Sequence, residues 1–221
     1  MQDLPRGFAR FALVLLVALA AVSASAQTAA PSGTAAPAPA VKPSAAIDAL
    51  HASLLDVMKN AEALGYAGRE QKLRTVIPKY FDVDEMARQS LGGQQWKAAS
   101  DDAKRRYLDT FERFMVANYA GRFDGFSGQS FETLGEGPGP RDTVIVKSRL
   151  LDPTDKNVAL NYRMHQVGGD WKVIDVYLDG SVSELALRRS EFVSIVKRQN
   201  LDALLVALDA KIAKLAAGGE S

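Results

Sequence analysis

Apolar residues recur every three or four positions along the chain after residue 46, which is the period of helices with one buried face. The first run, from Ile47 to Leu64, predicts a helix with Ser44 placed to cap its start. A second helix is predicted over residues 69–77, and Pro78 is expected to end it. This part of the chain is therefore expected to be helical.

Two more helices are predicted before residue 125. Asp82 and Glu85 have the spacing of a capping box, which predicts a short helix that stops at the glycine pair 92–93. A longer helix is predicted from Ser100, and one of its sides is unusually aromatic. That side carries Tyr107, Phe111, Phe114, Met115 and Tyr119.

The apolar period then shortens to two residues, which predicts strands. Four strands are expected, at about 129–135, 143–151, 157–167 and 171–178. Segments rich in glycine, proline and aspartate separate them, so consecutive strands are expected to pair as an antiparallel meander.

Helical patterns return at the C-terminal end of the chain. Ser181 and Glu184 have the spacing of a capping box, and a leucine-rich stripe after Asn200 predicts a last helix. The order of helices, strands and helices predicts an α+β fold. We expect a curved four-stranded antiparallel sheet of the nuclear-transport-factor-2-like type, covered by about six helices.

The first 46 residues lie outside this pattern. Arg6 and Arg10 precede an apolar run and the segment Ala24-Ser25-Ala26, so residues 1–26 are predicted to be a signal peptide. The run is shorter than the roughly 20 residues of a membrane span. Residues 27–46 are rich in alanine and proline and are predicted to be a disordered linker, which leaves 47–217 as one domain. The signal predicts a periplasmic protein.

Composition and charge narrow the possible functions. The chain has no cysteine, which excludes disulfides, thiolate metal sites and the acylated cysteine of a lipoprotein. It has 27 basic and 26 acidic residues and no long basic run. Nucleic acid is therefore not expected as a partner.

Candidate catalytic residues are few. The two histidines, His51 and His165, lie far apart in the sequence and neither has the spacing of a metal-ligand pair. We predict that His51 lies at the edge of the core and that His165 faces solvent. The segment GFSGQS lacks the spacing of a nucleophile elbow. These observations predict that the protein is not an enzyme and that it binds no metal ion or cofactor.

Two charged residues fall on apolar faces, Asp175 in the last predicted strand and Arg189 in the helix that follows. At about 100° per residue from Leu185, Arg189 falls inside the apolar arc of its helix. A charge buried alone costs several kcal/mol. We therefore predict a structural ion pair between Asp175 and Arg189 that joins the last helices to the sheet.

Several motifs together resemble the MlaC family of periplasmic lipid-binding proteins, also called the toluene-tolerance auxiliary component. The resemblance covers residues 47–208. It rests on FDVDEMA (residues 81–87), Gly93 with Trp96, Phe111 with Tyr119, WKVIDV (171–176), and Arg189 with Phe192.

This resemblance implies a carrier that shuttles phospholipid between outer-membrane and inner-membrane components of an MCE-type ABC transport system. The implied partners are an inner-membrane ABC transporter with an MCE-domain protein and an outer-membrane lipoprotein complex. The acyl chains are expected in a lipid cavity between helices and sheet. The residues predicted to line it are Phe111, Phe114, Met115, Val144, Val146, Leu160, Tyr162, Tyr177, Leu185 and Phe192.

Alternatives remain open at this point. The same residues could form a dry core, because apolar stripes look identical in both cases. The segment SVSELALRR departs from the family pattern, with Arg188 where many members have tyrosine, and it is more similar to the hopanoid-associated, HpnM-like branch. The runner-up function is a nuclear-transport-factor-2-like pocket enzyme with Asp175 as general base. A chaperone-like module that binds protein would use the same apolar surfaces.

Overall fold

The computed structural model describes residues 42–218. The predicted signal peptide and most of the predicted linker lie outside the described residues. Seven helices are described: α1 (Pro43–Lys59), α2 (Ala61–Tyr80), α3 (Val83–Leu91), α4 (Gly93–Ala98), α5 (Asp101–Arg122), α6 (Glu184–Arg198) and α7 (Leu201–Ala216). Five strands lie between α5 and α6: β1 (Ser130–Pro138), β2 (Val144–Leu151), β3 (Val158–Val167), β4 (Asp170–Leu178) and β5 (Val182–Ser183).

The strands form one antiparallel sheet in the order β1-β2-β3-β4-β5, as the meander predicted. The expected number of four strands is wrong by one. The extra strand β5 has two residues, and Ser183 pairs with Tyr177 on β4. Because this pairing keeps the chain extended, α6 begins at Glu184 and is capped by Ser183, not by the predicted Ser181.

A bulge in β4 changes which of its side chains share a face. Arg163 on β3 pairs with Asp175, but the next residue of β3 pairs with Val173, so Ile174 is the extra residue. Val173 and Val176 both join the core cluster, although strict alternation would put them on opposite faces. Asp175 therefore does not share a sheet face with Val173.

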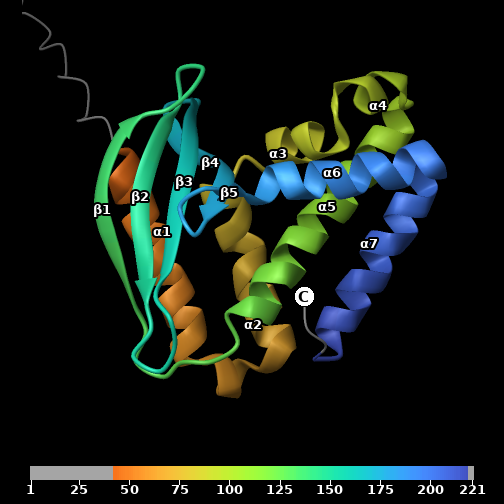
Figure 1. Cartoon of the computed structure of the whole chain (residues 1–221). Coiled ribbons are helices and arrows are strands. Elements are labelled where there is room, and N and C mark those ends of the chain that lie inside the picture. The colour runs from red at the N-terminus through yellow and green to blue at the C-terminus, as the bar shows by residue number, and fades with distance from the viewer. Residues whose placement is uncertain (1–41, 219–221) are drawn as a thin grey trace, which may run out of the picture. The chain divides into compact units, whose positions relative to one another are not determined.

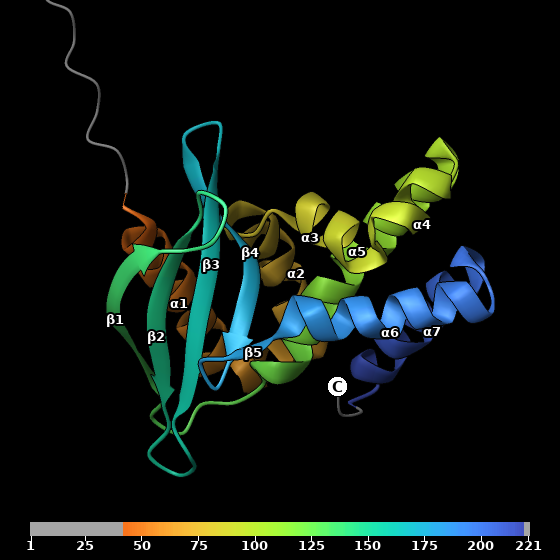
Figure 2. The same ribbon diagram turned by 45° about the horizontal axis from the view of Figure 1, so that its top comes forward.

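The helices form two groups around the sheet (Figures 1 and 2). In both views α1 and α2 lie against the sheet, and α3 to α7 form a helical group beside it. Within that group α5 packs along α7, and α6 packs along α3. The short strand β5 and the turn before it lead from the sheet into α6, so the two groups are joined there.

Local signals placed several helix ends correctly. Asp82 accepts a hydrogen bond from the backbone N–H of Glu85, Gly92 follows the end of α3, and Ser100 caps α5. The first helix instead begins at Pro43, which suits the first turn because proline lacks the N–H that would be unpaired there. The expectation that Pro78 ends the second helix is wrong, because α2 continues to Tyr80.

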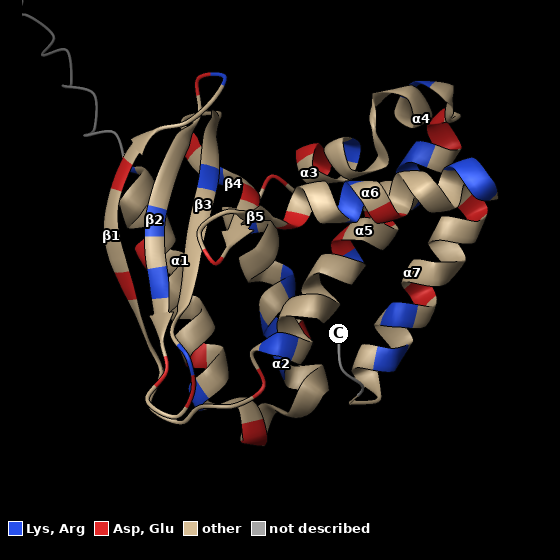
Figure 3. Ribbon diagram, viewed as in Figure 1, with Lys and Arg blue, Asp and Glu red and all other residues tan. Residues whose placement is uncertain are grey.

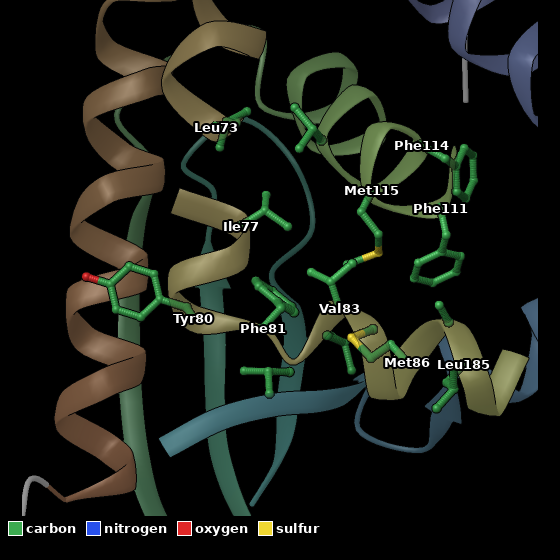
Figure 4. Packing of buried hydrophobic residues seen from close by; sticks show 14 of the residues in the cluster. Leu73, Ile77, Tyr80, Phe81, Val83, Met86, Phe111, Phe114, Met115 and Leu185 are labelled. Atoms are coloured by element: carbon green, nitrogen blue, oxygen red, sulfur yellow. The ribbon is translucent and has the colours of Figure 1, made fainter. Parts of the chain in front are cut away.

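One continuous set of buried apolar residues runs from α1 and the sheet through α3 and α5 to α6 and α7. Figure 4 shows part of it, with Val83 and Met86 near the start of α3 and Phe111 and Met115 on α5 directed toward the same interior region. Over residues 42–218, no helix is both long enough and apolar enough to cross a bilayer.

Candidate functional site

Aromatic rings from α5 and α6 pack together in the helical group. Phe192 makes edge-to-face contacts with Phe111, at 6.4 Å between ring centroids, and with Phe114, at 6.3 Å. Met115 and Leu185 are buried in the same apolar set. We call these five residues the aromatic cluster. Each is at most 5% exposed, so the described form of the protein is closed around them.

The sheet contributes part of the predicted cavity lining to the same core. Val146 and Tyr162 are buried in it, and Leu160 packs against it. Val144 is half-buried and pairs with the buried Met164. Tyr177 pairs with Asn161 and therefore lies on the sheet face opposite to that of Tyr162. It is the predicted lining residue of the sheet that lies away from the inner face.

His51 provides a polar contact on this inner face. Its ring stacks on Phe131 at 4.0 Å, and its Nε2 lies 3.1 Å from the hydroxyl of Tyr162. Burial lowers the pKa of His51 to about 4, against a smaller opposing effect of Asp48. His51 is 4% exposed, which confirms its predicted place at the core. It is neutral at physiological pH.

A group of charged side chains from α5, α6 and α7 lies over the aromatic cluster, and Figure 3 colours the charged positions of these helices. The Arg122 Nη1 donates to Glu184 Oε1 at 2.7 Å, and the Arg188 Nη2 lies 3.7 Å from Glu184 Oε2. The guanidinium of Arg188 and the amine of Lys211 lie over the Phe114 ring, at 4.8 and 5.7 Å from its centroid. These four residues, called the polar rim here, line a hollow of about 220 Å³ together with Leu187 and Glu191.

Tyr119 connects the polar rim to the sheet side of the core. Its ring contacts Phe81 edge-to-face at 5.4 Å and stacks on Phe123 at 5.5 Å. Burial raises the pKa of the Tyr119 hydroxyl well above its usual range, and Tyr162 and Glu184 lie close enough to raise it further. The hydroxyl therefore stays protonated at physiological pH.

The family model described as MlaC protein matches residues 48–210, which is most of the chain. The chain belongs to the MlaC family. A solved structure of the phospholipid-binding protein from Ralstonia solanacearum, in complex with a phospholipid, is similar to this chain with a TM-score of 0.66. The two sequences are 22% identical over 80% of this chain and 99% of the other, so this likeness shows a shared fold. No curated protein matches the chain.

In this MlaC family member the predicted ion pair between Asp175 and Arg189 is not formed. Asp175 accepts hydrogen bonds from the Ser183 hydroxyl at 2.7 Å and from the Leu185 backbone N–H at 3.1 Å. Burial raises the pKa of Asp175, while these hydrogen bonds and Arg163 partly offset that effect. Asp175 thus holds the start of α6 to the sheet through the helix N-terminus, where negative charge is favourable.

Arg189, the arginine of α6 that was predicted to enter the protein, does not do so. Arg189 is exposed, and it lies near Gly92 and lines a separate hollow with Val193 and Lys197. Arg188, whose side chain is 12% exposed, is the one that enters the protein. Arg188 lies on the side of α6 that also carries Ile195, which is half-buried.

The remaining candidate residues have structural contacts. His165, predicted to face solvent, is half-buried, and its Nε2 lies 2.8 Å from Asp82 Oδ2, which joins β3 to the start of α3. Within residues 42–218 no three His, Cys, Asp or Glu side chains gather in a way that could hold a metal.

Proposed function

We propose that this protein is a periplasmic carrier whose cargo is a membrane phospholipid, with the acyl chains held in the region of the aromatic cluster. The observation that carries the proposal is a continuous buried apolar set that runs from the sheet to α6 and ends under a polar rim. Membership of the MlaC family supports it, as does the fold shared with a phospholipid-binding protein.

The energetics of a lipid in water require such a region. Each methylene transferred to water costs about 0.8 kcal/mol, so one chain of about sixteen carbons costs roughly 12 kcal/mol. A carrier therefore has to surround the chain with apolar side chains, while the head group stays near water. The aromatic cluster and the polar rim are adjacent, so the acyl chains of a lipid would lie in the apolar region while its head group lies among the charged residues.

Loading requires the closed form to open. Most of the ten residues predicted to line the cavity are buried in the apolar core, so they have to separate before a lipid chain can enter between them. α6 follows β5 directly, and its N-terminus is held to β4 by Asp175. In our proposal α6 shifts relative to α5 and a lipid chain replaces the ring contacts of Phe192.

The resemblance to the family extends the proposal to partners and compartment. We propose that residues 1–26 direct export to the periplasm, and that the carrier exchanges lipid with an inner-membrane ABC transporter bearing an MCE-domain protein and with an outer-membrane lipoprotein complex. A hopanoid is the alternative cargo.

The proposal is tested by the content of the exported protein. The full chain is expressed with its own N-terminal segment, purified from the periplasm without detergent, and analysed by native mass spectrometry and solvent extraction. We expect a bound species with the mass of a phospholipid and a start of the mature chain after Ala26.

A delipidated sample provides the second measurement, with labelled phospholipid and labelled hopanoid offered separately. Uptake of phospholipid alone supports the proposed cargo, and uptake of hopanoid alone replaces it. A protein that is empty after export and that takes up neither lipid contradicts the carrier function.

A further inference from the structure

The guanidinium of Arg188 belongs to a largely buried side chain, forms an ion pair with Glu184 and borders the hollow of the polar rim. It has five N–H donors in a fixed plane. Its nearest carboxylate, Glu184, is 3.7 Å away, beyond hydrogen-bond distance, and within residues 42–218 Arg188 donates no hydrogen bond. Desolvation lowers the pKa of Arg188 from its usual value, which shows that burial is the dominant effect on this group.

Glu184 also pairs with another arginine of the polar rim. Glu184 is already held by Arg122 at 2.7 Å, so it does not need Arg188 to balance its charge. An ion pair at 3.7 Å occupies few of the five donors of Arg188, so the guanidinium keeps N–H groups for a further acceptor. Arg188 borders the hollow of the polar rim, so an acceptor that enters this hollow can reach it.

The charges around the hollow favour an anion. Arg122, Arg188 and Lys211 face Glu184 and Glu191 there, which leaves an excess of positive charge. The guanidinium carbon of Arg188 lies 4.8 Å from the centroid of the Phe114 ring, so the charged group is next to the aromatic cluster. A planar guanidinium binds phosphate oxygens through two parallel hydrogen bonds, which an amine cannot do.

We propose that Arg188, with Arg122 and Lys211, binds the phosphate ester of the lipid head group at the polar rim. The inference rests on the proposed carrier function and adds to it the chemical class that the site selects. Phe114 lies directly under Arg188, so the same side chains place the phosphate next to the region assigned to the acyl chains. A lipid with the same chains and no phosphate gains nothing from Arg188.

The test compares two lipids that differ only in the phosphate-containing head group. Delipidated full-length protein is loaded with dipalmitoyl phosphatidylglycerol or with dipalmitoylglycerol, and the affinity for each is measured by titration with native mass spectrometry. Arg188→Gln removes the charge, Arg188→Lys keeps the charge without the paired donors, and Arg189→Gln changes the exposed neighbour as a control. Thermal unfolding of each variant confirms that it is folded.

We expect Arg188→Gln to weaken phosphatidylglycerol binding about tenfold or more, the range of a hydrogen bond to a charged group, and to leave dipalmitoylglycerol within about twofold. Arg188→Lys should lie between the wild type and Arg188→Gln, and Arg189→Gln should change neither lipid. Inorganic phosphate, titrated alone, should stabilise the wild type only weakly because it lacks acyl chains.

Three outcomes overturn the inference. If Arg188→Gln weakens both lipids equally or neither lipid, the carrier function stands and the phosphate assignment fails. If inorganic phosphate stabilises the protein through Arg188 while phosphatidylglycerol binding is unchanged in Arg188→Gln, the site binds free phosphate and not a head group. If the wild type takes up neither lipid, the proposed function fails together with the inference.

Discussion

Replacement of Phe192 by alanine tests whether the aromatic cluster is both a core and a cargo site. Phe192 is 2% exposed and contacts the rings of Phe111 and Phe114. Removal of a fully buried phenylalanine side chain costs about 3–5 kcal/mol, the sum of lost transfer free energy and the cavity left behind. We expect Phe192→Ala to lower the free energy of unfolding of the delipidated protein by this amount in a guanidinium titration.

The lipid should then reverse much of this loss in Phe192→Ala. A ligand that binds only the folded state stabilises it by about 2.7 kcal/mol at a hundredfold excess over Kd. In Phe192→Ala the acyl chain has no ring contacts to displace and fills the cavity, so the stabilisation by phospholipid should exceed that of the wild type.

Leu54→Ala is the control, because Leu54 is equally buried but lies on α1 and is not a predicted lining residue. It should lose about 2–5 kcal/mol, and lipid should stabilise it no more than it stabilises the wild type. A loss below about 1 kcal/mol in Phe192→Ala, or equal stabilisation of both variants by lipid, would refute the reasoning.

Three further predictions concern residues that lie around the site and stabilise the elements that form it. Asp175→Ala leaves the Ser183 hydroxyl and the buried Leu185 N–H without their acceptor, so it should lower the free energy of unfolding by about 2–3 kcal/mol. Asp175→Asn keeps one acceptor and should lower it by about 1 kcal/mol. Urea titrations measure both losses, and lipid uptake by Asp175→Asn should not change. His51 has a pKa of about 4 in the folded state, below its unfolded value of about 6.5, so its contribution to stability is complete above pH 6.5 and is lost as the pH falls toward 4. The slope of the free energy of unfolding against pH between 4 and 6.5 should therefore be flatter in His51→Gln. An unchanged slope would exclude His51 as its origin. Gly92→Ala should cost about 1–2 kcal/mol in thermal unfolding, because Gly92 has φ +83° and a Cβ there would lie 3.2 Å from Val193, whereas Gly93→Ala, with open space around it, should cost less.

Short-range signals in the sequence predicted much of the fold. The caps at Asp82 and Ser100 were predicted correctly because a cap depends on residues within one helical turn. The four main strands and their order followed from the period-two pattern and the turn residues between them. Most of the predicted lining residues are buried because they lie on the apolar faces that these periods define.

The tertiary structure decided the features that depend on contacts between distant segments. The bulge at Ile174 and the pairing of β5 set the face of Asp175 and the start of α6, and no local pattern indicates either one. His165 meets Asp82 across the boundary between β3 and α3.

The partner of Asp175 and the place of Arg188 show the same division. The sequence by itself determined that charged residues lie near the apolar arc of α6, because that follows from the helical period. Only the packing of α6 over α5 decided that Arg188 lies above Phe114 while Arg189 stays exposed. A helix rotation of one residue exchanges the two arginines, and only contacts with neighbouring elements determine that rotation.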